Sequence, residues 1–129
     1  MTSRPYLFDT GALIDIYRGR QRIAPYFEAL AEQAAYLSVL SEAELWRSLR
    51  PGEIERHEAL LARFVPLPLT SEAARLAGQW MQAYGAIGLG WMDALITATA
   101  AVAGSPLLTR DRRLAGVLAN QVEFVLYDG

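Results

Sequence analysis

The sequence predicts an α/β fold with a mostly parallel central sheet. Short apolar runs of the β type alternate along the chain with longer stretches of helical periodicity, which is typical of strands joined by helical crossovers. The chain has 129 residues, of which 53% are hydrophobic and 20% are charged, a composition that suits a globular protein with its own core. No linker, repeat or low-complexity segment divides it, so we expect a single domain over residues 1–129.

Three strands are expected in the first half of the chain, at residues 5–8, 35–40 and 65–69. The third is a short strand or an edge segment, because a proline inside a strand has no N–H group to donate. Helical patterns occupy residues 12–19, 22–34, 41–50 and 53–64. We expect Gly19 to end the first of these helices and Ser41 to be the N-cap of the third.

The second half continues the same alternation. Thr70 or Ser71 is expected to cap a helix over residues 72–85, which is followed by a glycine-rich loop at 85–90. The remaining elements are a helix rich in small residues at 91–104, a strand at 105–109, a short helix at 111–119 and a final strand at 122–127.

The residues that the chain lacks exclude several kinds of chemistry. There is no cysteine, which rules out disulfides, thiol nucleophiles and zinc–sulfur sites. All twelve basic residues are arginine, so no lysine is present for a Schiff base or a P-loop. The one histidine, His57, is expected on a helix surface and not as a catalytic base. With no membrane-length apolar run and no signal-peptide pattern, we expect a cytoplasmic protein.

Four acidic residues fall at matching places in this arrangement. Asp9 directly follows an expected strand, Asp111 follows another after one intervening residue, and Glu44 lies in the first turn after a third. Asp93 begins the helix that leads into the strand before Asp111. Because ligands bind at the carboxyl ends of parallel strands, we expect these four carboxylates to converge at that end of the sheet.

Each acid also has an ordinary structural explanation. Asp9 and Asp111 could cap the helices that follow them, Glu44 could complete a capping box with Ser41, and Asp93 could complement a helix dipole. Four neighbouring carboxylates, however, repel one another unless a cation neutralises them. Oxygen ligands of this kind suit Mg²⁺ or Mn²⁺, and such a site favours phosphoryl chemistry, as in a phosphodiesterase or nuclease.

Three stretches of the chain together resemble the PIN domain, and in particular the VapC-type toxins of bacterial toxin–antitoxin pairs. They are YLFDTGALIDIYRG (6–19), LSVLSEAELWRSL (37–49) and DALITATAAVAGSPLLTRDRRL (93–114). The resemblance implies a three-layer α/β/α sandwich around four to five strands. It also implies a magnesium-dependent endoribonuclease in which an acidic cluster holds a metal that activates water.

On the family's pattern, the metal ligands and catalytic residues are Asp9, Glu44, Asp93 and Asp111, with Thr10 and Thr109 adding hydroxyl or water-mediated contacts. The family's E-L-x-x-G motif appears here with Ser48 in place of the glycine. Glu42 stands two residues before Glu44, so the choice between them rests on this motif. Asp15, six residues after Asp9, is interpreted as a solvated or pairing acid.

The expected partners are an RNA substrate, a cognate antitoxin that occludes the site, and a second copy of the chain in a homodimer. Candidate phosphate contacts are Arg18, Arg20, Arg47, Arg110 and Arg112, although these could also be ordinary surface charges or pair with the acids. Trp46, Trp80 and Trp91 could stack on bases, but burial in the core or an interface is favoured.

The helices at 22–34 and 53–64 have apolar faces that are wide enough to take a partner helix, although burial in the core explains the same residues as well. These residues are Tyr26, Phe27, Leu30, Leu60, Leu61 and Phe64. Two alternatives to the ribonuclease stay open: a non-catalytic PIN-like interaction module, and a metal phosphohydrolase that acts on other nucleic acid.

Overall fold

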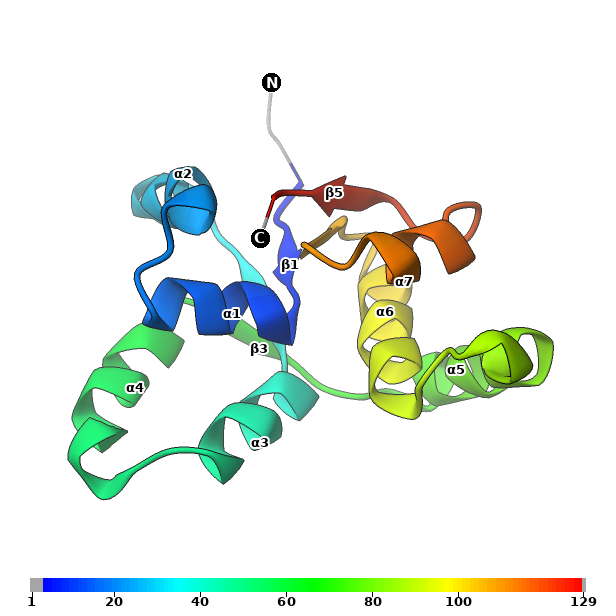
Figure 1. Cartoon of the computed structure of the whole chain (residues 1–129), viewed down its shortest axis with the longest axis horizontal. Helices are drawn as coiled ribbons and strands as arrows, with labels where there is room; N and C mark the ends of the chain where they lie inside the picture. Colours follow the sequence, from blue (N-terminus) through cyan, green and yellow to red (C-terminus); the bar gives the residue numbers. More distant parts are fainter. Residues whose placement is uncertain (1–3, 129) are drawn as a thin grey trace.

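A computed structural model describes residues 4–128, and its centre is a five-stranded sheet in which every strand pairs in parallel with its neighbours (Figure 1). The strand order is β3-β2-β1-β4-β5. The strands are β1 (Leu7–Phe8), β2 (Tyr36–Ser38), β3 (Val65–Leu67), β4 (Leu107–Thr109) and β5 (Phe124–Leu126). Leu7 of the central strand is in register with Tyr36 on one side and Leu107 on the other. The predicted parallel sheet is confirmed, with β3 at an edge as its proline requires.

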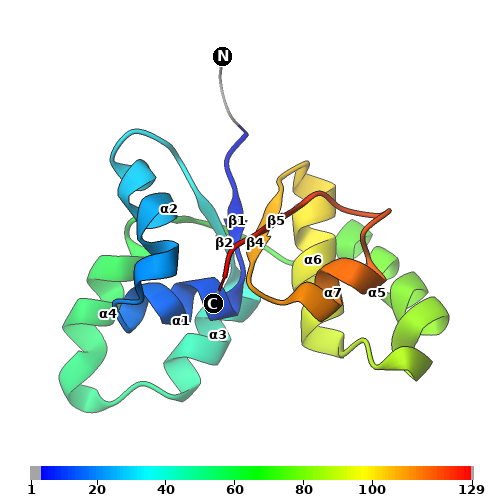
Figure 2. The same cartoon turned by 45° about the horizontal axis from the view of Figure 1, so that its top comes forward.

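Helices cover both faces of this sheet, which gives three layers (Figure 2). On one side lie α1 (Thr10–Tyr17), α2 (Ala24–Glu28), α3 (Val39–Arg47) and α4 (Ile54–Leu61). On the other side lie α5 (Ser71–Tyr84), α6 (Trp91–Ala103) and α7 (Arg112–Val117). Successive residues of a strand point to opposite faces, so Leu7 joins the core beneath α5 and α6 while Phe8 joins the core beneath α1. The predicted three-layer α/β/α sandwich is confirmed.

The stretch at 22–34 departs from the single helix that its pattern predicts. It consists of a 3-10 helix η1 (Gln21–Ile23), the short α2 and a second 3-10 helix η2 (Ala29–Ala31). Pro25 lies in the first turn of α2, where its missing N–H group costs nothing. The other helices begin and end within a few residues of their predicted bounds, and Thr70 caps α5 by accepting a hydrogen bond from the Ala73 amide.

Ser41 is not the N-cap of its helix as predicted, so the capping box that would have been the ordinary explanation of Glu44 does not form. The N-cap of α3 is Ser38, the last residue of β2, whose hydroxyl accepts a hydrogen bond from the Leu40 amide at 3.0 Å. The backbone of Ser38 is still extended, so the helix begins at Val39. Ser41 is buried inside the first turn instead.

His57 is buried, which contradicts its predicted place on a helix surface. Its ring on α4 packs edge-on against Trp46 of α3, with ring centroids 4.8 Å apart. Of the three tryptophans, Trp80 is in the core as expected, whereas Trp46 and Trp91 are exposed.

No helix among residues 4–128 combines the length and apolar character needed to cross a membrane.

Candidate active site

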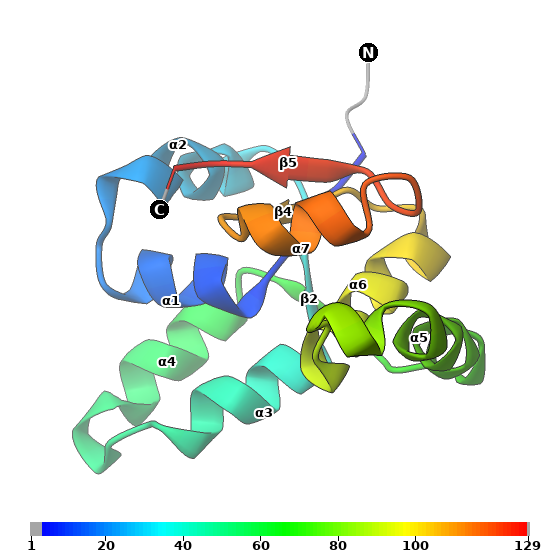
Figure 3. The same cartoon turned by 45° about the vertical axis from the view of Figure 1, so that its right-hand side comes forward.

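Asp9, Glu44, Asp93 and Asp111 line one cleft of about 230 Å³ at the carboxyl end of the sheet. They arrive from four elements, because Asp9 follows β1, Asp111 follows β4, and Glu44 and Asp93 lie on α3 and α6. In Figure 3 the first turns of α1, α3 and α6 lie near one another below the sheet. The structure therefore brings together all four carboxylates that the sequence singles out.

Asp9 caps helix α1 and also lines the cleft. Its Oδ1 accepts a hydrogen bond from the Thr10 amide at 2.9 Å, which caps α1, and its Oδ2 accepts one from the Thr109 hydroxyl at 2.7 Å. Burial raises the pKa of this carboxyl, and the two hydrogen bonds partly offset that effect. Because both oxygens are held, the direction of the carboxylate is defined by its neighbours.

Glu44 is positioned across the cleft by Thr10. The Thr10 hydroxyl donates to Glu44 Oε1 at 2.7 Å, and the Ser41 hydroxyl lies 2.8 Å from the same Thr10 oxygen. These contacts tie the first turn of α1 to α3. Glu42, the alternative acid in the motif, is not among the residues that line the cleft. The geometry therefore favours Glu44 over Glu42.

Asp111 is the N-cap of α7, where its Oδ1 accepts from the Leu114 amide at 3.0 Å. Its own amide donates to the Thr109 hydroxyl oxygen at 3.1 Å. Thr109 thus accepts from the backbone of Asp111 while it donates to Asp9, and this single hydroxyl connects two acids of the cleft. Capping and cleft formation, which the sequence leaves as alternatives for these acids, occur together.

Asp93 lies in the first turn of α6, half-buried among the other three acids. Burial, followed by repulsion from Asp9, Asp111 and Glu44, raises its pKa from 3.8 to about 6. A carboxyl shifted this far inside a cleft marks a concentration of negative charge, which is a common feature of functional sites.

The donor set and charge of the cleft fit a hydrated divalent cation. All four ligand candidates are carboxylates, which suit Mg²⁺ or Mn²⁺, and a cation would relieve the repulsion that raises the pKa of Asp93. Within residues 4–128, no three His, Asp or Glu side chains form a ready-made cage for a metal. Mg²⁺ needs no such cage, because it usually keeps several waters and binds through one or two carboxylates.

Arg110 lines the cleft, but its guanidinium is already engaged. It donates to Asp15 Oδ1 at 2.9 Å, and the Tyr127 hydroxyl donates to Asp15 Oδ2 at 2.7 Å. Burial and the bond to Asp15 raise the pKa of the Tyr127 hydroxyl. Asp15 is 1% exposed, so its interpretation as a pairing acid is confirmed and its interpretation as a solvated one is wrong. Arg20 approaches the same carboxylate at 3.8 Å.

The other arginine candidates differ in how they are engaged. Arg112 pairs with Asp128 at the surface, with 2.6 Å between nitrogen and oxygen. Arg18 and Arg47 form no ion pair with any residue between 4 and 128. Sequence reasoning did not identify Arg110 and Tyr127 as the partners of Asp15, because these contacts join distant parts of the chain.

The PIN domain family model matches residues 6–118. Among solved structures, the chain is 26% identical to a chain of a toxin–antitoxin complex from Klebsiella pneumoniae, with a TM-score of 0.69, covering 85% of this chain and 89% of that one. VapBC2 from Rickettsia felis, bound to a DNA fragment of its promoter, is 17% identical with a TM-score of 0.80, covering 95% and 98%. FitAcB from Neisseria gonorrhoeae is 24% identical with a TM-score of 0.74, covering 93% and 96%. No curated protein sequence matches the chain.

Proposed function

Because the chain belongs to the PIN domain family, we propose that it is a magnesium-dependent endoribonuclease and the toxin of a type II toxin–antitoxin pair. One observation carries the nuclease assignment, namely that carboxylates from four separate elements line a single cleft where the family's acids are expected. Neither a thiol nor a lysine is present in the chain, so chemistry based on those nucleophiles has no residue to perform it.

In this proposal Asp9, Glu44, Asp93 and Asp111 hold Mg²⁺, or Mn²⁺ in its place. A bound ion of this kind supplies positive charge for the phosphodiester and lowers the pKa of water. The threonines keep the ligands in place: Thr109 holds Asp9 at 2.7 Å, and Thr10 holds Glu44 at the same distance. Such orientation by neighbours that do not touch the metal is usual around metal sites.

The proposed antitoxin follows from the similarity to toxin–antitoxin complexes. Two grooves have apolar walls that suit a partner helix. One lies between α1, α2 and α4, and the other lies between β1 and α2. Phe27 and Leu60 line a groove of about 280 Å³, and Tyr26 and Leu30 line another of about 320 Å³. Phe64 is in the core and is not part of this surface. We also expect the chain to form a homodimer.

A cleavage assay tests the nuclease. The protein, purified free of any partner, is mixed with structured RNA in Mg²⁺ or Mn²⁺, and then with a chelator. We expect cleavage that the chelator stops and that Asp93→Asn abolishes. Asp128→Asn, which alters an exposed carboxylate paired with Arg112, is the matched control and keeps the activity.

Other outcomes would point to the alternatives. Cleavage that survives both the chelator and Asp93→Asn would overturn the metal-dependent proposal. Cleavage of DNA with no action on RNA would indicate a different phosphohydrolase. No cleavage of any nucleic acid, together with no metal binding by calorimetry, would indicate a non-catalytic interaction module.

A further inference from the structure

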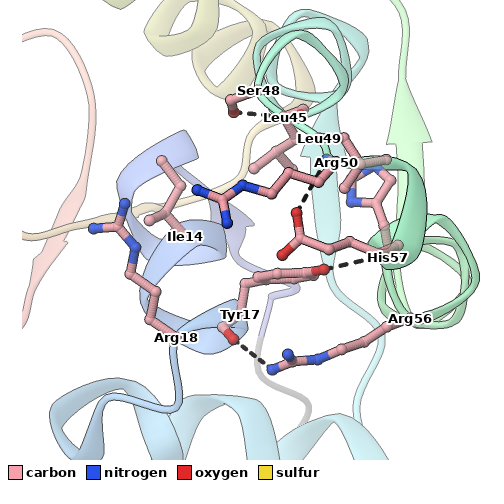
Figure 4. Close-up of a pocket in the computed structure, with 10 residues that line it drawn as sticks. Ile14, Tyr17, Arg18, Leu45, Ser48, Leu49, Arg50, Arg56 and His57 are labelled. Atoms are coloured by element: carbon pink, nitrogen blue, oxygen red, sulfur yellow. Dashed lines mark hydrogen bonds between the residues drawn. The ribbon is translucent and has the colours of Figure 1, made fainter.

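A further cavity, of about 590 Å³, lies between α1, α4 and the end of α3 (Figure 4). Its apolar walls include Ile14, Leu45 and Leu49, and its polar lining includes three arginines. It shares none of its lining residues with the acidic cleft.

The charge of this cavity is opposite to that of the acidic cleft. Arg18, Arg50 and Arg56 line it beside a single acid, Glu53. Glu53 accepts a hydrogen bond from the Arg50 backbone amide at 3.0 Å and forms no ion pair with residues 4–128. The lining therefore carries an excess of positive charge, although the net charge of the whole chain is −2.

Two of the three guanidinium groups are free to take an anion. Arg56 is engaged, because it donates to the Tyr17 carbonyl at 2.6 Å and lies over the Tyr17 ring. Arg18 and Arg50 are exposed, and neither pairs with an acid in the part of the chain that the structure describes. Figure 4 shows the side chain of Arg50 extending across the cavity toward Arg18.

The inner wall also contains a polar atom without a partner. His57 is 1% exposed, and its Nε2 makes no hydrogen bond with residues 4–128. A buried polar atom left without a partner costs free energy, and the cost falls when water or a ligand supplies the missing bond. The cavity is thus not a simple gap in an apolar core.

The position of the cavity relates it to the acidic cleft. Helix α1 begins at Thr10 in the cleft and ends just before Arg18 in the cavity, and eight residues of helix span about 12 Å. On α3, Glu44 faces the cleft while the adjacent Leu45 lines the cavity. A single strand of RNA with a phosphate at the carboxylates would reach the cavity within a few nucleotides.

We propose that this cavity is a subsite for single-stranded RNA, in which Arg18 and Arg50 bind a backbone phosphate a few nucleotides from the cleaved bond. Guanidinium groups match phosphate oxygens with paired hydrogen bonds, and two of them around one cavity suit one phosphate group. The inference rests on the proposed ribonuclease function. It identifies a place on this acidic protein where the anionic substrate binds.

Binding, measured without cleavage, tests the subsite. A fluorescent single-stranded RNA of roughly 12 nucleotides is titrated with the Asp93→Asn protein in chelator, over a range of salt concentrations. Each phosphate contact to a single strand adds about −0.7 to the slope of log affinity against log salt. We expect Arg18→Ala with Arg50→Ala to weaken binding about tenfold and to make this slope shallower by about 0.7.

Control variants separate the subsite from general charge effects. Arg75→Ala, which removes an exposed arginine from α5, is expected to leave both the affinity and the salt slope within error. Arg18→Lys with Arg50→Lys keeps the charge and is expected to recover the slope. Competition by inorganic phosphate, with no preference for RNA, would show a free-anion site and overturn the proposal.

The test distinguishes this subsite from the nuclease itself. Active enzyme whose Arg18→Ala/Arg50→Ala form binds RNA with unchanged affinity and slope would overturn the subsite and leave the nuclease standing. Arginine-dependent RNA binding in a protein that never cleaves would support the subsite and overturn the nuclease. Arginine-dependent binding of a hexaglutamate peptide, with RNA binding unaffected, would assign the cavity to an acidic protein partner and overturn the proposal.

Discussion

The hydroxyl of Thr109, at the end of β4, donates a 2.7 Å hydrogen bond to Oδ2 of Asp9, at the end of the neighbouring strand β1. The two residues are a hundred positions apart in the chain, and the parallel pairing of β1 with β4 places them side by side. Because the carboxylate is buried, this bond supplies much of what replaces its lost hydration.

Thr109→Val is therefore expected to destabilise the protein. Valine keeps the shape of threonine but leaves the Asp9 oxygen without its donor, so we expect the free energy of unfolding to fall by about 1–3 kcal/mol at pH 7. Thr99→Val is the matched control, since the Thr99 hydroxyl donates to the neutral Leu95 carbonyl of its own helix rather than to a buried carboxylate, and its effect should be smaller. Chemical denaturation measures both, and equal losses would contradict a special role for the Thr109 bond.

The raised pKa of Asp93 predicts a pH dependence of stability in the absence of metal. Its pKa is about 6 in the folded protein and 3.8 without these surroundings, so the folded state holds the proton more tightly. The loss of stability caused by the charged carboxylate is absent below pH 3.8. It grows as the pH rises from 3.8 to about 6 and is complete above that pH. Because Asp93 is only half-buried, solvent screening reduces this cost to about 1–2 kcal/mol.

Asp93→Asn should remove that cost. In chelator we expect the variant to be more stable than the natural protein at pH 8, and the difference to shrink toward pH 5. Denaturation curves across this range measure it, with the exposed Asp128→Asn as a control that shows no such trend. A gain that is constant with pH would show that the buried negative charge of Asp93 is not its source.

The sequence was most informative where an apolar strand ends in an acid. Asp9 and Asp111 follow buried strands, and parallel pairing alone then brings them to the carboxyl end of the sheet. That rule needs no knowledge of side-chain packing, and it placed the acids at the cleft, whereas the three layers were expected from the resemblance to the PIN domain.

The errors concern features that depend on tertiary contacts. Ser38 and Ser41 both fit an N-cap by residue type, and only the length of β2 decides between them. His57 is polar on a helix whose apolar pattern favours another face, yet its contacts with Trp46 and Tyr17 bury it. The Asp15–Arg110 pair joins residues 95 positions apart, which no local pattern reveals.

Metal binding should stabilise the folded protein even without substrate. An ion that binds only the folded state, at a concentration 100 times its Kd, adds about 2.7 kcal/mol to the free energy of unfolding. This corresponds to a rise of several degrees in Tm. We expect Mg²⁺ or Mn²⁺ to raise the Tm of the natural protein and of Asp128→Asn, but not of Asp9→Asn. A thermal scan with and without chelator measures the shift, and a full shift in Asp9→Asn would remove Asp9 from the proposed ligands.

The pair of Arg110 with Asp15 is expected to matter far more than the similar pair of Arg112 with Asp128. Asp15 is almost completely buried, so Arg110→Ala leaves a charge without its main partner and should cost about 3 kcal/mol. The carboxylate of Asp128 is largely exposed, so Arg112→Ala should cost less than about 1 kcal/mol.

A double variant identifies the source of this cost. If the buried charge is responsible, Asp15→Asn introduced into Arg110→Ala should recover part of the lost stability, because the amide needs no counter-charge. Urea denaturation of the single and double variants measures the coupling. Losses that simply add would show that Arg110 stabilises the protein by packing, with little contribution from its pairing to Asp15, and would leave Asp15 held mainly by the hydroxyl of Tyr127.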